Sequence, residues 1–283
     1  MARLMMAGLV APALAVTIVF FLVPLSLLLA YSFFGYAQGN IRYEVTLANF
    51  VRLLGDPFYL MIIGRTMLVA TATTALCILL GYPIAIGIVR ARPRVRSVLL
   101  MLILLPLLIG GVVRGYGWLL LLDERGVVNS LLLSAGLIRQ PLKMLFNFGG
   151  VVVAMVEVLI PFFILPLIGS LSNIDPLVQR AALSMGASRT QTFFRVTLPL
   201  SLAGVIAGAS IVFSLALNIF VVPRIAGGPS YLVLATLAYQ QVGDVGNIPF
   251  GSAVSILMLV MTLVTVVAVN RVLLSRYRHL GVA

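Results

Sequence analysis

The chain has 283 residues, of which 62% are hydrophobic and only 9% are charged. Soluble domains have about a quarter of their residues charged, so this composition excludes a water-covered globular surface, and its hydrophobicity excludes disorder. A polytopic membrane protein remains, and its net charge of +12 indicates Lys and Arg held in cytoplasmic loops rather than nucleic-acid binding.

Six apolar runs are long enough to cross a bilayer, which takes about 20 residues each. None alternates as a membrane β-strand does, so we expect an all-α fold of six transmembrane helices in a single domain. The first run is too long for the core of a signal peptide and is expected to stay as a span. The expected spans cover residues of about 5–34, 59–89, 98–122, 148–171, 200–222 and 250–269.

Basic residues concentrate in alternate connecting segments. The side that holds both termini has a single acid, Asp175, whereas the other side mixes its basic residues with five acids. The positive-inside rule therefore places both termini in the cytoplasm. The basic residues of that side are Arg3, Arg90, Arg92, Arg94, Arg96, Arg180, Arg189, Arg195, Arg271, Arg276 and Arg278.

The chain lacks the residues that several kinds of catalytic chemistry require. The chain has no G-x-x-x-x-G-K-[ST] phosphate loop, one histidine (His279) and one cysteine (Cys77). These absences exclude ATP hydrolysis by that loop, histidine-based triads, multi-cysteine metal sites and internal disulfides, so we expect no enzyme, cofactor or metal site. An ion-gradient-driven secondary transporter and a structural or assembly protein stay open. The lack of a clear internal repeat weakens the former.

Five polar or aromatic residues within the spans are candidates for a solute path. Glu157 in the fourth span costs about 2.5 kcal/mol or more to insert, so its carboxylate is expected to face a cavity or a partner such as Arg114. Arg114 could also snorkel, and Tyr116 and Trp118 could be interfacial aromatics. Asn218 is either a cavity residue or a hydrogen bond between helices.

The segment 172–199 predicts two short helices at the membrane surface. Asp175 and Pro176 form an N-cap and first-turn pair, and Gly186 is a helix stop with positive φ. Ser188 and Gln191 form a capping box that begins the second helix. The first helix has an apolar face, so it either rests on the bilayer or docks a partner. That face consists of Leu177, Val178, Ala181, Ala182 and Met185.

This segment resembles the EAA signature of permease subunits of binding-protein-dependent ABC importers. The signature reads E-A-A, three residues, Gly, and later a hydrophobic residue with Leu-Pro. The matching residues are Arg180-Ala181-Ala182, Gly186 and Val196-Thr197-Leu198-Pro199. Arg180 replaces the signature glutamate, so any polar contact that this glutamate makes to the ATPase in relatives must be rebuilt or inverted here.

Further segments resemble the spermidine/putrescine-type members in the same order along the chain. They are Leu47–Phe50, Leu53–Tyr59, Leu80–Ala85, Val113–Trp118, Gly126–Ser130, Leu200–Gly208, Gly227–Pro229, Tyr239–Gln241 and Pro249–Gly251.

The resemblance implies a type I importer permease in a bacterial inner membrane, surrounded by lipid. It implies a second permease subunit, two ATPase subunits that bind ATP and Mg²⁺, and a periplasmic solute-binding protein. Relatives in that group import polyamines, other small organic solutes or ions, and of these we expect a polyamine or related small organic cation. The segment 172–199 becomes a coupling loop that docks the ATPase through Arg180, Ala181, Ala182, Gly186, Ser188, Leu198 and Pro199.

The charge pattern yields a test of topology. A cysteine introduced near Arg94 or Arg278 should be shielded from a membrane-impermeant thiol reagent in intact cells, whereas one near Gly126 should react, because the basic loops are retained on the inner side. Labelling of the Arg94 position in intact cells would reverse the orientation, and with it the placement of the coupling loop.

Overall fold

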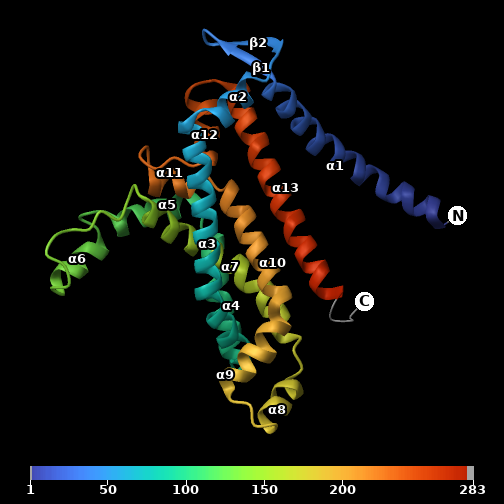
Figure 1. The fold of residues 1–283 in the computed structure, drawn as a ribbon, viewed down its shortest axis with the longest axis vertical. Helices are drawn as coiled ribbons and strands as arrows, with labels where there is room; N and C mark the ends of the chain where they lie inside the picture. Colours follow the sequence, from blue (N-terminus) through green and yellow to red (C-terminus); the bar gives the residue numbers. More distant parts are fainter. Residues whose placement is uncertain (1, 279–283) are drawn as a thin grey trace. The chain divides into compact units, whose positions relative to one another are not determined.

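The computed structural model describes residues 2–278, so His279 lies outside the described residues. Helices dominate, and one short hairpin is present (Figure 1). The elements are α1 (Ala2–Ser32), β1 (Phe34–Ala37), β2 (Asn40–Val45), α2 (Ala48–Gly55), α3 (Pro57–Arg90), α4 (Pro93–Leu104), the 3₁₀ turn η1 (Leu105–Leu108), α5 (Gly111–Leu122), α6 (Val127–Ser134), α7 (Phe148–Ser172), α8 (Pro176–Ser184), α9 (Arg189–Thr192), the π-helical segment η2 (Phe193–Thr197), α10 (Leu198–Asn218), α11 (Val221–Gly227), α12 (Leu234–Tyr239), the π-helical segment η3 (Gln240–Asp244) and α13 (Ile248–Arg278).

Five helical segments are long and apolar enough to cross a membrane: Leu14–Ser32, Pro57–Arg90, Phe148–Ser172, Arg189–Asn218 and Ile248–Val269. They coincide with five of the six expected spans. The fifth expected span, 200–222, ends early, because the helix stops at Asn218 and the chain is extended at Ile219 before α11 begins. The remaining expected span, the third, corresponds to a bent pair of helices. If this pair is one crossing, the described residues have up to six helices long and apolar enough to span a membrane.

The expected continuous span 98–122 is broken in the structure. Helices Pro93–Leu108 and Gly111–Ser134 meet at an angle of 99°. Pro106 lies in the 3₁₀ turn, and Ile109 and Gly110 are extended. Proline removes a backbone donor and glycine has low helix propensity, so Pro106 and the pair Gly110-Gly111 end one helix and begin another within three residues.

The hairpin β1–β2 is a departure from the all-helical expectation. Ala37 pairs with Asn40, and the two residues between them have positive φ, 53° at Gln38 and 81° at Gly39. Two consecutive residues with positive φ form the type I′ turn that joins twisted antiparallel strands. The strands are short, so the chain stays essentially α-helical.

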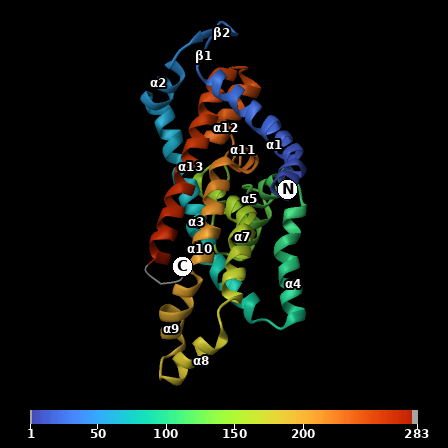
Figure 2. The same cartoon turned by 90° about the vertical axis from the view of Figure 1, so that its right-hand side faces the viewer.

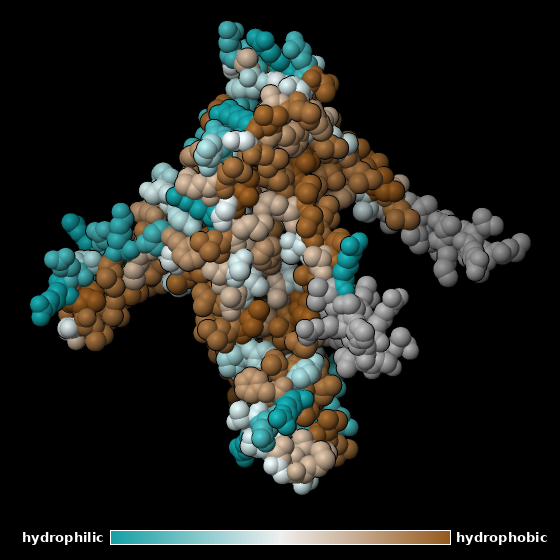
Figure 3. Space-filling model, in the orientation of Figure 1, coloured by the Kyte–Doolittle hydropathy of each residue, from teal (hydrophilic) through white to brown (hydrophobic). Residues whose placement is uncertain are grey.

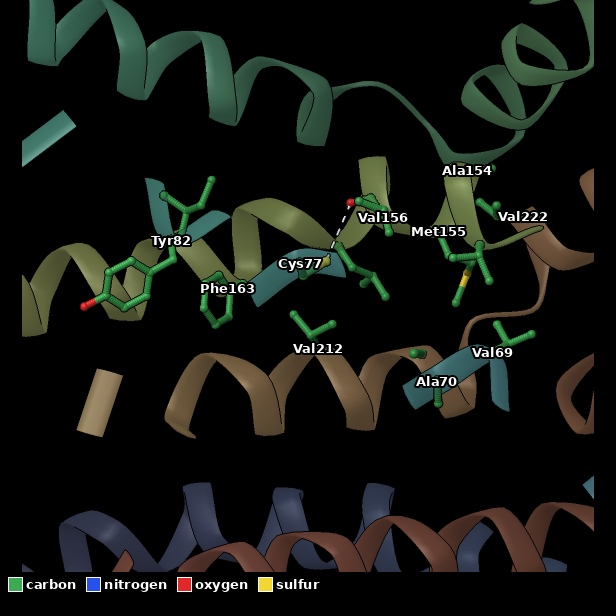
Figure 4. Packing of buried hydrophobic residues seen from close by; sticks show 14 of the residues in the cluster. Val69, Ala70, Cys77, Tyr82, Ala154, Met155, Val156, Phe163, Val212 and Val222 are labelled. Atoms are coloured by element: carbon green, nitrogen blue, oxygen red, sulfur yellow. Dashed lines mark hydrogen bonds between the residues drawn. The ribbon is translucent and has the colours of Figure 1, made fainter. Parts of the chain in front are cut away.

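The chain divides into two compact units. The smaller contains the residues up to Ile62 together with Leu237–Val260, and the larger contains Ile63–Thr236 and the residues from Met261 onward. The larger unit has a core of buried side chains from α3, α7, α10 and α11. Figure 4 shows Phe163 and Val212 packed near Cys77, whose thiol donates to the carbonyl of Val156 at 3.9 Å.

Helices α7 and α10 pack at close range because glycine replaces larger residues at their contact. A Cβ atom at Gly208 would lie 2.8 Å from the carbonyl oxygen of Phe163, and one at Gly204 would lie 2.5 Å from the Cβ of Ser170. Small residues allow this approach between membrane helices, where lipid offers no hydrophobic driving force for association. The segment that contains α8 and α9 connects the end of α7 to the start of α10 and projects beyond both helices (Figures 1 and 2).

Gly208→Ala should lower the free energy of unfolding by about 1–3 kcal/mol, because the added methyl group overpacks the contact with α7. Gly169→Ala is the matched control, since a Cβ there meets nothing within 4 Å. It should leave the thermal midpoint in detergent unchanged or higher. Equal midpoints for the two variants would show that the helices do not depend on this close contact.

Candidate functional sites

Glu157 of α7 accepts hydrogen bonds from two side chains of α5. The Arg114 Nη2 atom donates to Oε1 at 2.7 Å and to the backbone oxygen of Glu157 at 3.3 Å. The Trp118 Nε1 atom donates to Oε2 at 3.3 Å. Arg114 and Trp118 are four residues apart and so share one face of their helix. Both carboxylate oxygens therefore have a donor within the chain.

The two members of this ion pair differ in exposure. The Arg114 side chain is 8% exposed and the Glu157 side chain 34%. The Arg114 Nε atom is buried, with no partner among the described residues. The arginine therefore relies on Glu157 for its charge compensation, while part of the carboxylate stays accessible. Of the two surroundings expected for the Glu157 carboxylate, a cavity or a partner such as Arg114, the structure shows the pairing with Arg114.

The other two path candidates lie outside this group. Tyr116 is on α5, two residues from both Arg114 and Trp118, and is 58% exposed. The Asn218 Nδ2 atom donates to the backbone oxygen of Ser214 at 2.7 Å and to Thr262 Oγ1 at 3.1 Å. Asn218 thus joins α10 to α13. Of the two roles expected for it, the structure shows the hydrogen bond between helices. Among residues 2–278 no three His, Cys, Asp or Glu side chains lie close enough to hold a metal ion.

The local geometry expected for the coupling loop is confirmed. The Asp175 side chain accepts from the backbone N–H of Leu177 at 2.8 Å, directly before Pro176. Gly186 has a φ of +86°. Ser188 and Gln191 form the reciprocal capping box at the start of α9. The Ser188 side chain is therefore used within the chain, as a cap.

The two signature alanines point in different directions. Ala182 is 7% exposed because α8 packs against α9 and η2, whereas Ala181 and Arg180 are exposed. The expectation that both alanines face a partner is therefore corrected for Ala182, which faces its own chain. The outward apolar surface, here called the outer face of α8, consists of Leu177, Val178, Ala181 and Met185, all of them exposed, from 45% at Val178 to 82% at Met185. Figure 3 shows polar and apolar residues mixed over α8 and α9, in contrast to the hydrophobic surface of the long helices.

Two positioning residues were missed by sequence reasoning. Tyr82 of α3 and Ser201 of α10 share a buried hydrogen bond of 2.7 Å between their hydroxyl oxygens. The ring of Phe193 packs edge-on against Tyr82, with centroids 5.5 Å apart. These contacts fix the start of α10 and the π-helical segment against α3. Leu198 is half-buried at this junction and Pro199 is exposed. In the sequence, the hydrogen bond between Tyr82 and Ser201 was signalled only by one polar residue within each of two apolar runs.

Solved structures share this architecture. A bacterial alginate ABC transporter in complex with alginate pentasaccharide-bound periplasmic protein aligns with a TM-score of 0.79 and 18% identity over 95% of this chain and 94% of that one. Inward-facing MetNI methionine ABC transporter aligns with a TM-score of 0.57 and 17% identity over 76% of this chain and 94% of that one. The fold is therefore that of an ABC transporter permease.

Curated relatives narrow the family, although no protein-family model matches the chain. The spermidine/putrescine transport system permease protein PotB of Haemophilus influenzae is 34% identical over 240 residues, 84% of each chain. PotB of Escherichia coli is 34% identical over 80% of this chain and 82% of its own. The inner membrane ABC transporter permease protein YdcU of Escherichia coli is 31% identical over 82% and 77%. The chain belongs to the family of ABC transporter permeases that contains PotB.

Replacing Glu157 should lower the stability of the chain more than replacing its partner Arg114. Glu157→Gln should lower the free energy of unfolding by roughly 2 kcal/mol, because it leaves the buried guanidinium uncompensated; the cost is less than for a fully buried pair, since Glu157 is partly exposed. Arg114→Met should cost less, and the double variant should recover most of the thermal midpoint in detergent.

The same variants separate stability from transport. If the carboxylate serves the solute path, the double variant should regain its midpoint while solute uptake stays low. Recovery of both quantities would leave the ion pair with a structural role only. If the double variant is no more stable than Glu157→Gln, the uncompensated charge of Arg114 is not the reason that Glu157→Gln loses stability.

Proposed function

We propose that the chain is the permease subunit of an ATP-driven importer for a polyamine or a related small organic cation. The observation that carries this proposal is the 34% identity to PotB over 84% of both chains, since those relatives are named for spermidine and putrescine. The molybdenum transport system permease protein ModB of Mycobacterium bovis is also related, at 31% identity over 71% of this chain. The solute is therefore the part of the proposal that most needs a direct test.

The proposed assembly contains several subunits in a bacterial inner membrane. Two ATPase subunits bind ATP and Mg²⁺, a second permease completes the pore, and a periplasmic protein delivers the solute. The missing phosphate loop supports a separate ATPase, and the alginate transporter's periplasmic protein supports the delivery partner. The positive-inside rule supports cytoplasmic termini, and YdcU is named as an inner-membrane protein.

The outer face of α8 is the proposed docking surface for the ATPase. Its apolar side chains are exposed on a short helix whose start and end are fixed by Asp175 and Gly186. An amphipathic helix with such a face fits a hydrophobic groove. Because α8 packs against α9 and η2, and α9, η2 and α10 follow one another without a break, a displacement of the docked α8 would move α10 with it. Rigid-body movement of this kind can switch a pore between two states.

Glu157 is the proposed contact for a solute ammonium group. Its carboxylate is partly exposed but already holds Arg114 and Trp118. A cationic solute would share or exchange this carboxylate with Arg114, and the indole of Trp118 offers a cation–π surface beside it. A single carboxylate is a limited site for a polyamine. We therefore assign most of the selectivity to the delivery protein.

The function can be tested in proteoliposomes that contain the permeases, the ATPase and the binding protein of the same operon. Uptake of radiolabelled spermidine or putrescine should require internal ATP and survive collapse of the proton gradient. Uptake that follows the gradient without ATP would support the secondary transporter instead. Uptake of molybdate but not of polyamines would overturn the proposed solute and keep the class.

The same assay tests the docking surface. Ala181→Asp should release the ATPase and abolish uptake, because an unpaired charge in an apolar groove costs several kcal/mol. Ala181→Ser is the control, with nearly the same volume and no charge, and should keep at least about half of the uptake. Normal ATPase binding by Ala181→Asp would exclude the outer face of α8 as the docking element.

A further inference from the structure

Two adjoining cavities lie where α3 ends and α4 begins, beside α8 and η2. The first measures about 380 Å³ and is lined by Arg90, Arg96 and Gln179, among others. The second measures about 530 Å³ and is lined by Arg90, Gln179 and Arg189. Arg90 and Gln179 therefore line both cavities. Either cavity is much larger than the roughly 10–15 Å³ of such space that one water molecule needs.

The charge of these cavities is uncompensated. Among the described side chains, three guanidinium groups line them and no carboxylate does. Arg96 donates to the neutral Ser172 Oγ at 3.2 Å, and among residues 2–278 none of the three arginines has an ion-pair partner. Asp175 lines a different groove, and its carboxylate caps α8. A concave surface lined by charge of one sign attracts the opposite charge.

The lining groups suit a phosphate in particular. Guanidinium groups bind phosphate oxygens through paired, charge-assisted hydrogen bonds, and the amide of Gln179 adds a neutral donor. Arg90 comes from α3, Arg96 from α4, Gln179 from α8 and Arg189 lies at the start of α9. A bound phosphate would therefore link the ends of two long helices to the two short helices.

We propose that these cavities bind a phosphate group and thereby hold α8 and α9 against the ends of α3 and α4. The phosphate can belong to an anionic phospholipid headgroup or be free in solution. The position favours the lipid, because α3 has 34 residues and is about 50 Å long, which exceeds the hydrocarbon thickness of about 30 Å. Its end at Arg90 then lies at headgroup level. Apolar side chains leading there along α3 are exposed, with Leu79 67% and Ile84 41% exposed.

Native mass spectrometry of the full chain in neutral detergent tests this site, independently of which solute is carried. The unaltered chain should retain phosphatidylglycerol in preference to phosphatidylcholine offered at the same ratio. Arg90→Gln should weaken this retention about fivefold, and Arg90→Gln with Arg96→Gln about 25-fold, as expected from roughly 1 kcal/mol for each arginine near an anionic lipid. Arg90 is exposed and has no ion-pair partner among residues 2–278, so folding should be preserved.

Arg94→Gln is the matched control. It removes one charge from the same basic run at an exposed position that lines neither cavity, so retention should stay within about twofold, because solvent and salt screen an exposed charge. Arg96→Lys keeps the charge and should keep most of the binding. An equal loss in Arg94→Gln would overturn the proposal, since attraction would then be a property of the whole basic run.

Inorganic phosphate separates the two sources. If millimolar phosphate displaces phosphatidylglycerol from the unaltered chain, and itself binds more weakly to Arg90→Gln, the site takes phosphate from solution. If the lipid stays bound, the headgroup is the ligand; both results support the site. Failure of the unaltered chain to prefer phosphatidylglycerol or to bind inorganic phosphate would overturn it, and an acidic segment of the ATPase would then be the alternative occupant.

Discussion

The burial of α7 is the constraint on which the larger unit depends. This helix is apolar along its whole length and packs against α5, α10 and α11. It has no amphipathic face, so its side chains must be enclosed on several sides at once, as expected of a helix that is hydrophobic all round. Gly204 and Gly208 of α10 meet this demand on one side by allowing direct contact with its backbone. Its one ionised residue, Glu157, must then find a partner nearby, and α5 supplies Arg114.

The same helix determines where the coupling loop begins. The chain leaves α7 at Ser172 and enters α8 at Pro176, with only three residues between them. Arg96 donates to Ser172 at this point, and the hydrogen bond between Tyr82 and Ser201 fixes the other end of the loop to α3. The short helices are therefore held at both ends by the packed core. Their outward surface is therefore presented by a rigid base, as the proposed docking of an ATPase would require.

The features that the sequence predicted well are local ones. Five of the six apolar spans, the N-cap at Asp175, the positive φ at Gly186 and the capping box at Ser188 each depend on residues that are close in sequence, and all are present. The features that it missed depend on distant residues. Ala182 is buried because α8 folds back on α9 and η2, which spacing on one helix cannot reveal. The hairpin had a usable signal, Gln38-Gly39 before the alternating residues of 40–45, but strong helical runs on both sides obscured it.

The break in the third span has a consequence for solvation. Ile109 and Gly110 are extended, and the first turn of α5 has no side-chain cap, so several peptide N–H and C=O groups there lack helical partners. Hydrocarbon chains cannot accept or donate hydrogen bonds, and irregular backbone at membrane depth persists only against protein or water. The bilayer therefore does not seal this part of the chain. Protein or water must therefore cover Gly110 in place of hydrocarbon, and α11 supplies part of that cover, because Val221 lies beside Gly111.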